Sequence, residues 1–150
     1  MTLSTISFSK ADIEIAQLVD LLMRRIHTDL DARSGEFDVA RVGPLGGMVL
    51  MTLADIEPAP IHRLVELVAR DKAQVTRLLQ TLGKKGLIDR SNSPDDGRVC
   101  VLSLSPKGLE TVHGLRIALA QSIDTVLDRL SGKERAQMTR LLRKGLLGQD

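Results

Sequence analysis

Residues Asp71–Ser105, DKAQVTRLLQTLGKKGLIDRSNSPDDGRVCVLSLS, decide the fold of this 150-residue chain. The first part of the stretch predicts a helix, because apolar residues recur at the i, i+3, i+4, i+7 spacing of one helix face. These apolar residues are Val75, Leu78, Leu79 and Leu82. Asp71 is the expected N-cap, with Gln74 reaching back to complete a capping box, and Gly86 marks the end of the helix.

The opposite face of this expected helix is polar and positive, and it holds no carboxylate. It consists of Lys72, Ala73, Gln74, Thr76, Arg77, Gln80 and Thr81. A face that only meets water usually mixes charges of both signs. Residues 62–105 together hold eight Lys or Arg against five Asp or Glu, although the whole chain has a net charge of only +2. The uneven placement of charge favours a polyanionic partner.

Beyond Gly86 the apolar pattern changes to period two, which predicts a β-hairpin. One strand begins at Leu87 and the other holds Val99, Val101, Leu102 and Leu104, with the turn-forming sequence SNSPDDG between them. Arg98 stands just past the hairpin tip, and Ser105-Pro106 opens another helix as N-cap and first residue. A basic helix followed by a hairpin and a further helix is the outline of a winged helix-turn-helix.

The stretch from Val75 to Gly108 resembles the MarR family of bacterial transcriptional regulators. The hallmark of that family is D-x-R at the wing, followed by a strand that ends in Leu-Thr or Leu-Ser. Asp96, Arg98, Leu104 and Ser105 fall in that register, and the residues Val-Thr-Arg from Val75 match the core of the family's recognition helix. The resemblance implies a mostly helical α+β protein that acts as a homodimeric repressor on a pseudo-palindromic operator in double-stranded DNA.

A single MarR-like domain is expected over residues 1–150, with dimerisation helices in 10–43 and 106–147 around a winged helix-turn-helix lobe in 44–105. The helix predicted from Lys10 to about Ala32 is apolar on more than one side, which indicates that a second chain or layer covers it. Residues 34–38 are expected to form a loop. The other predicted helices start at Pro44, run over Ile61–Ala69, run from Pro106 to about Leu130, and start at a Ser131 capping box.

Seven residues are the predicted DNA contacts: Lys72, Ala73, Gln74, Thr76, Arg77, Asp96 and Arg98. Gln74 and Arg77 lie in the first two turns of the recognition helix, and Gln and Arg side chains can bind adenine and guanine edges with two hydrogen bonds. Arg98 is expected to reach a narrow minor groove. Asp96 is expected to orient Arg98 through a charge-assisted hydrogen bond.

The resemblance also implies a crevice for a small aromatic effector, which Gly47, Met48 and Met51 would line. Many family members have a large residue near there, where this chain has small or flexible ones. Gly46 and Gly47 lie inside a predicted helix, where each is about 1 kcal/mol less favourable than Ala, so close packing or a hinge is expected.

The sequence offers no catalytic motif, cofactor-binding loop or multi-thiolate metal site, so neither an enzyme nor a metal or cofactor is expected. The single cysteine, Cys100, is interpreted as a small strand residue, with a redox role as the alternative. No signal peptide or membrane span is recognisable, and a cytoplasmic location is expected. Two other functions stay open: a winged-helix module that binds a protein, and a non-specific architectural DNA-binding protein.

Overall fold

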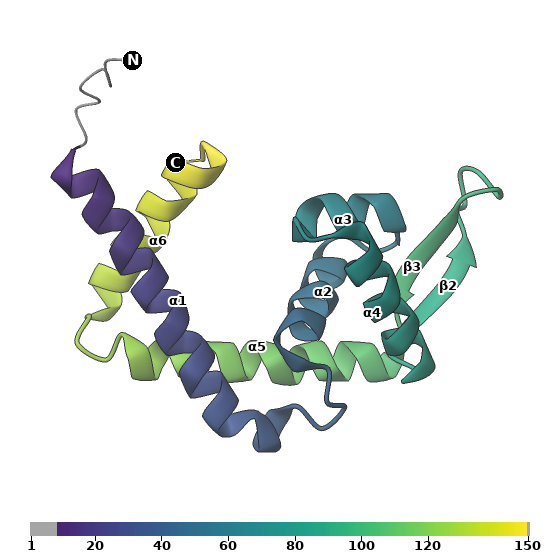
Figure 1. Ribbon diagram of the computed structural model, residues 1–150, viewed down its shortest axis with the longest axis horizontal. Helices are drawn as coiled ribbons and strands as arrows, with labels where there is room; N and C mark the ends of the chain where they lie inside the picture. Colours follow the sequence, from purple (N-terminus) through teal and green to yellow (C-terminus); the bar gives the residue numbers. More distant parts are fainter. Residues whose placement is uncertain (1–8, 150) are drawn as a thin grey trace, which may run out of the picture. The chain divides into compact units, whose positions relative to one another are not determined.

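The computed structural model describes residues 9–149 of the chain (Figure 1). The described residues form six helices and one three-stranded sheet. In chain order the elements are α1 (Lys10–Phe37), α2 (Gly43–Ile56), β1 (Ala59–Pro60), α3 (Ile61–Val68), α4 (Lys72–Lys84), β2 (Ile88–Asn92), β3 (Cys100–Leu104), α5 (Pro106–Val126) and α6 (Gly132–Leu147). The predicted mostly helical winged helix-turn-helix is confirmed.

The chain divides into two compact units, which are described separately below. The first, here called the lobe, is residues 30–119 and holds the helix-turn-helix and the wing. The second, here called the terminal unit, combines residues 1–29 with residues 120–150. Helices α1 and α5 each run along the chain from one unit into the other.

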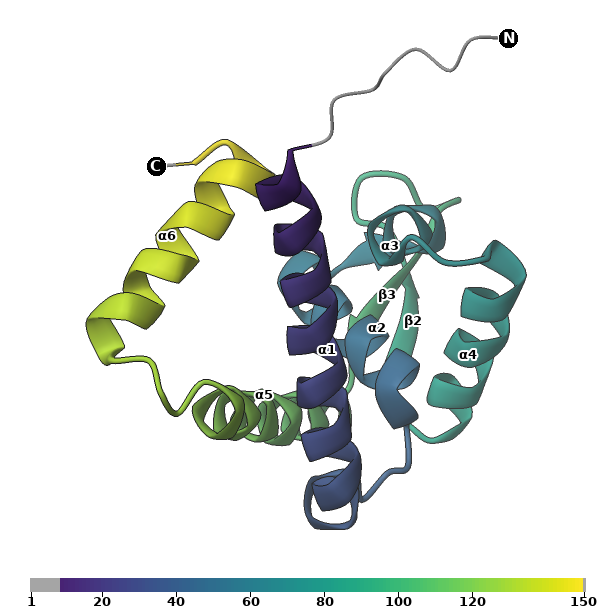
Figure 2. The same cartoon turned by 60° about the vertical axis from the view of Figure 1, so that its left-hand side comes forward.

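The sheet of the lobe is antiparallel, with the strand order β1-β3-β2. Ile88 pairs with Leu104 and Asn92 with Cys100, so the predicted hairpin is confirmed. Figures 1 and 2 both show α4 beside this hairpin. The third strand, β1, is an addition to the predicted fold: Ala59 pairs with Leu102, and the nearby Glu57 carboxylate accepts the Leu104 N–H at 3.2 Å.

The core of the lobe is built from leucines and valines of α2, α3, α4 and the hairpin. Val75, Leu79 and Leu82 of α4 are at most 1% exposed, whereas Leu78 on the same predicted face is partly buried. They pack with Leu50, Leu53, Leu64, Leu87 and Leu102. Each fully buried Leu or Val side chain stabilises the folded state by about 1.5–3 kcal/mol relative to an exposed one. This burial fixes which face of α4 points away from the lobe.

Two helix ends differ from those expected. Helix α1 continues to Phe37, so the expected loop at residues 34–38 is wrong for all but its last residue. The turn comes instead at Asp38, whose carboxylate accepts the N–H groups of Val42 at 2.8 Å and Gly43 at 3.0 Å. These are donors that the start of α2 would otherwise leave unpaired.

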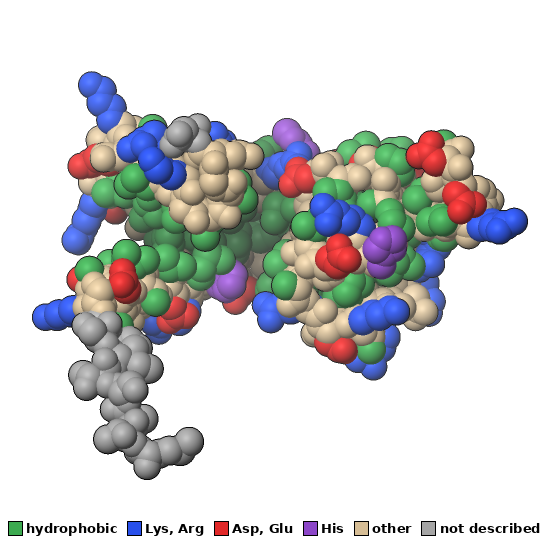
Figure 3. Space-filling model, turned by 90° about the horizontal axis from the view of Figure 1, so that it is seen from above, with side chains coloured by type: hydrophobic (Ala, Val, Ile, Leu, Met, Phe, Trp, Pro, Cys, Tyr) green, Lys and Arg blue, Asp and Glu red, His purple; other side chains and the backbone are tan. Residues whose placement is uncertain are grey.

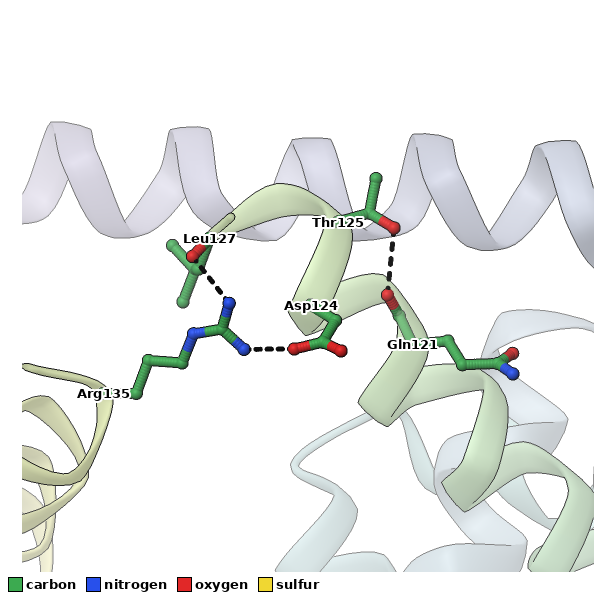
Figure 4. A network of polar contacts seen from close by, with 5 residues as sticks. All are labelled: Gln121, Asp124, Thr125, Leu127 and Arg135. Carbon is green, nitrogen blue, oxygen red and sulfur yellow. Dashed lines mark hydrogen bonds and ion pairs between the residues drawn. The ribbon is translucent and has the colours of Figure 1, made fainter. Parts of the chain in front are cut away.

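Helix α5 ends at Val126 rather than near Leu130, where Arg135 of α6 meets its last turns (Figure 4). The Arg135 guanidinium donates to the Leu127 carbonyl oxygen at 2.9 Å and also binds the Asp124 carboxylate. Cationic side chains near a helix C-terminus satisfy carbonyls that have no partner within the helix. The Leu127 carbonyl, just past the end of α5, is therefore bound by a residue eight positions further along the chain.

The buried face of α5 includes a glycine near the start of the helix. Leu109 is 52% exposed, whereas its neighbour Gly108 is buried. A Cβ added to Gly108 would lie 2.1 Å from the Leu87 carbonyl oxygen, so α5 approaches the chain after α4 more closely than any side chain allows. The close packing expected in α2 is confirmed at Gly46, where a Cβ would lie 2.9 Å from the Val42 Cβ.

The terminal unit leaves most of its apolar side chains in contact with solvent (Figure 3). Helix α6 starts at the predicted Ser131–Glu134 capping box and has no buried residue. Hydrogen bonds from the Ser131 backbone N–H and hydroxyl hold the pKa of the Glu134 carboxyl below its usual value. Large apolar side chains more than 40% exposed are Ile13, Ile15, Leu18, Val19, Met23, Leu141, Leu142, Leu146 and Leu147. None of the described helices combines the length and apolar character that crossing a bilayer requires.

Candidate nucleic-acid interface

The start of α4 is fixed by Asp71, whose carboxylate accepts the Gln74 backbone N–H at 3.4 Å. The N-cap prediction is confirmed, but Gln74 does not return the bond to the Asp71 backbone, so the capping box is incomplete. The Gln74 side chain consequently remains exposed in the first turn of α4. In helix-turn-helix proteins, the N-terminal residues of this second helix contact base edges in the major groove.

The predicted contacts of α4 lie on the side of the helix away from the lobe core. Lys72, Ala73, Gln74 and Arg77 are exposed, and Thr76 is half-buried. The Thr76 hydroxyl donates to the Lys72 carbonyl oxygen at 2.8 Å, which leaves its lone pairs outward. Among the described residues, neither Lys72 nor Arg77 has an ion-pair partner. Two cations with no intramolecular carboxylate are available to phosphates or base edges.

The wing is closed by backbone hydrogen bonds around its tip. The Ser93 N–H donates to the Val99 carbonyl at 2.7 Å, and the Val99 N–H donates to the Asp96 carbonyl at 3.0 Å. The Asp96 carboxylate accepts the backbone N–H of Arg98 at 3.0 Å. The predicted hydrogen bond between Asp96 and Arg98 is present, and its donor is the Arg98 backbone N–H. Asp96 thus shapes the turn through the backbone, as aspartates in tight turns commonly do.

The Arg98 side chain is exposed and, within residues 9–149, its guanidinium has no hydrogen-bond or ion-pair partner. We expect Arg98→Ala to weaken DNA binding and to make the slope of log affinity against log salt shallower by about one unit, because one phosphate-proximal cation is lost. The melting temperature should stay unchanged, since no intramolecular bond of the side chain is removed. Fluorescence anisotropy at several salt concentrations, with a thermal melt, measures both quantities. A lower melting temperature with an unchanged salt slope would assign Arg98 a structural role.

The sequence interpretation missed two exposed arginines of the lobe, Arg70 and Arg90. Arg70 lies in the turn between α3 and α4, next to the N-cap Asp71, and Arg90 lies on β2 opposite Leu102. In the described part of the chain neither has an ion-pair partner, unlike Arg63, which lies 3.3 Å from Glu66. Asp95 and Asp96 partly offset this charge at the wing tip. The excess of cations in residues 62–105 was the signal that could have identified both arginines.

The turn of the helix-turn-helix is made without glycine. Ala69 adopts a left-handed conformation with φ of +52°, and its N–H donates to the Val65 carbonyl at 3.1 Å. The left-handed region is unfavourable by about 1–2 kcal/mol for a residue with a Cβ. The surrounding core therefore holds α3 and α4 at their angle against this preference.

The expected effector residues lie together on α2. Gly47 is buried, with its Cβ position 3.5 Å from Leu115 Cδ1. Met48 and Met51 are half-buried against the lobe core. Effector binding at these residues stays a prediction. Among the described residues, no group of three or more His, Cys, Asp and Glu is placed to hold a metal ion, and Cys100 is exposed as a free thiol.

The family model for the MarR family matches residues 47–100, which are most of α2, the helix-turn-helix and the wing up to the first residue of β3. A crystal structure of a probable transcriptional regulator from Pseudomonas aeruginosa is 28% identical to the chain, with a TM-score of 0.69 over 91% of this chain and 100% of that one. Residues 47–100 of the chain therefore match the MarR family of transcriptional regulators.

Two further comparisons give relatives that are similar to this chain. It is 31% identical over 65 residues to the uncharacterized HTH-type transcriptional regulator YdgJ of Bacillus subtilis. That match covers 43% of this chain and 40% of YdgJ, so it spans less than half of the relative. A mutant MarR from E. coli in complex with operator DNA is 20% identical, with a TM-score of 0.69 over 93% of this chain and 99% of that one. This second likeness shows the shared fold.

Proposed function

We propose that this MarR-family protein binds double-stranded DNA as a homodimer and represses transcription in the cytoplasm from a pseudo-palindromic operator. The observation that carries the proposal is the outward face of α4, where Gln74 and Arg77 are exposed, together with the exposed Arg98 of the wing, which has no partner among the described residues. In helix-turn-helix docking, residues near the N-terminus of the second helix contact base edges in the major groove. A wing arginine suits the adjacent minor groove, whose negative potential rises where A·T pairs narrow it.

A second copy of the chain supplies the second half-site in this proposal. The terminal unit exposes apolar side chains on α1 and α6, whereas monomeric soluble proteins rarely expose large contiguous apolar patches. Covering that surface with the same surface of another copy gives a two-fold symmetric dimer. Its two α4 helices would then read half-sites roughly one helical turn apart.

Two alternatives predict different behaviour of the same surface. A protein-binding winged helix would need an anchor such as Trp, Tyr or a cluster of large apolar side chains. The outward face of α4 has none, because the exposed side chains of the helix are Lys72, Ala73, Gln74, Arg77, Gln80, Thr81 and Lys84. A non-specific architectural protein would use the same cations but would show no preference for any sequence.

Selection of bound duplexes from a random pool, followed by fluorescence anisotropy on the selected and a scrambled sequence, tests the proposal. We expect binding that weakens steeply as salt rises, because cations displace condensed counterions from phosphates. The selected duplex should retain an advantage of at least about 10³-fold over random DNA. Equal affinity for both sequences would favour the architectural alternative. Absence of binding at low salt would contradict the proposal.

We expect Gln74→Ala to relax the sequence preference at one position of each half-site, with a loss of about 1–3 kcal/mol if the amide binds an adenine edge with two hydrogen bonds. Gln80→Ala is the matched control, since it makes the same chemical change on the same helix, more than a turn further from its N-terminus. Repeating the selection with each variant measures the preference. An equal loss of affinity on every sequence would show that Gln74 contacts no base.

A further inference from the structure

Three segments that are far apart in the sequence meet at the C-terminal end of α4. They are residues 84–87 that end the helix, the loop at residues 38–42 between α1 and α2, and the start of α5 at residues 105–108. All three belong to the lobe. Hydrogen bonds to backbone carbonyl oxygens join the three segments. The junction therefore depends on main-chain geometry and not on matched charges.

Lys85 joins the first two segments. Its Nζ donates to the carbonyl oxygens of Ala40 and Arg41, both at 2.7 Å, across 45 and 44 residues of sequence. The loop is shaped to offer these oxygens, because Arg41 has a φ of +53° and Asp38 holds the two following backbone N–H groups. Lys85 has no carboxylate partner among the described residues. Its ammonium thus links the end of α4 to two backbone carbonyls of the α1–α2 loop.

The third segment completes the junction from the α5 side. The Lys107 Nζ donates to the Lys85 carbonyl oxygen at 3.0 Å, and the Ser105 hydroxyl donates to the Gly86 carbonyl oxygen. The Ser105 N–H donates to the Leu87 carbonyl at 3.0 Å. The carbonyls of Lys85, Gly86 and Leu87 come directly after the last residue of α4. The start of α5 therefore binds the chain that leaves α4, while Lys85 binds the α1–α2 loop.

We infer that Lys85 is a positioning residue for DNA recognition: by holding the end of α4 to the α1–α2 loop, it sets how the base-reading turns of α4 are presented. This inference rests on the proposed DNA-binding function. Side chains that read bases must be held to within about 0.5 Å of the productive geometry. A 13-residue helix fixed only by its apolar face could still slide or tilt, and the two bonds of Lys85 restrain its far end.

Lys84 provides a matched control, because it is the neighbouring cation at the same helix end and is exposed with no hydrogen-bond partner among the described residues. Lys85→Met and Lys84→Met each remove one positive charge while keeping a long side chain. We expect Lys85→Met to reduce the ratio of affinities for the selected and scrambled duplexes by about tenfold, the effect of one misplaced base contact. Lys84→Met should leave that ratio unchanged.

Amide hydrogen exchange on the free proteins reports the junction independently of DNA. Lys85→Met should speed exchange at residues 42–43 and 85–87, and Lys84→Met should not. Lys85→Gln, which keeps an N–H donor on a shorter side chain, should give a smaller change of the same kind and serves as the test if the methionine variant does not fold. Faster exchange or a lower melting temperature with an unchanged affinity ratio would overturn the positioning role.

Two further outcomes separate the possible failures. An equal loss of affinity on both duplexes, with a shallower salt slope, would make Lys85 an ordinary phosphate contact and would also overturn the inference. If the wild-type protein itself prefers no sequence, the proposed function fails. The affinities for the two duplexes are then equal already, and Lys85→Met cannot lower their ratio. Exchange rates that match in Lys85→Met, Lys84→Met and wild type would show that the junction does not restrain α4.

Discussion

Replacing Gly108 with alanine should lower the free energy of unfolding of the lobe by about 3–5 kcal/mol, the combined effect of overpacking and of two strained hydrogen bonds. The new Cβ would lie 2.1 Å from the Leu87 carbonyl oxygen and 3.1 Å from its carbon, and both are backbone atoms that cannot turn aside as a side chain can. The same oxygen accepts the Ser105 N–H, and the Gly108 N–H donates to the Ser105 hydroxyl at 3.0 Å. Relieving the clash therefore means separating α5 from the end of α4.

Gly114 provides the control in the same helix. A Cβ at Gly114 meets nothing within 4 Å, so Gly114→Ala should stabilise α5 by up to about 1 kcal/mol through helix propensity alone. Urea unfolding followed by far-ultraviolet circular dichroism measures both variants. Equal stability of the two alanine variants would show that α5 does not approach Leu87 as closely as described.

Replacing Leu142 with glutamate should raise the dissociation constant of the proposed homodimer at least about 100-fold, since its interface would lose a buried leucine and gain a charge to desolvate. Leu142 is 42% exposed on α6, where it lines a shallow hollow with Glu134, Gln137, Met138 and Leu141. Because a monomer presents one α4 to an operator with two half-sites, DNA affinity should fall together with dimerisation.

Leu109→Glu is the matched control, because Leu109 is similarly exposed but lies in the lobe, on α5. Sedimentation equilibrium from nanomolar to micromolar concentration should show a dimer for wild type and Leu109→Glu and a monomer for Leu142→Glu. Deleting residues 131–150 should likewise abolish the dimer. A stable monomer that still binds the operator with full affinity would refute this assignment of the interface.

The elements that the sequence predicted well are those whose stabilising contacts are local. Helix α4 shows its apolar spacing and its Asp71 cap within 13 residues, and the hairpin shows its alternation and its turn. Strand β1 has only two residues, and one of them is proline. It forms because Ala59 pairs with Leu102, 43 positions away, and no local sequence pattern predicts such a pairing.

The parts of the site that the sequence did not reveal depend on backbone acceptors. Every residue has a carbonyl oxygen, so nothing in the sequence distinguishes Ala40 and Arg41 as the partners of Lys85. The same holds at Asp96: a bond to Arg98 could be predicted, but only the closed turn shows that its donor is the Arg98 backbone N–H. Arg70 and Arg90 lie outside the helix face and the wing motif from which contacts could be predicted, in the turn before α4 and on β2.

The division of the chain has a consequence for the order of assembly during synthesis. The lobe is one continuous segment, residues 30–119, whereas the terminal unit needs residues from both sides of it. Segments with local contacts fold faster than those that must close a long loop, and domains generally fold as units while the chain emerges from the ribosome. A nascent chain would therefore complete the part that contacts DNA first. Pairing with a second copy then becomes a late event, available only to chains whose last helix has been made.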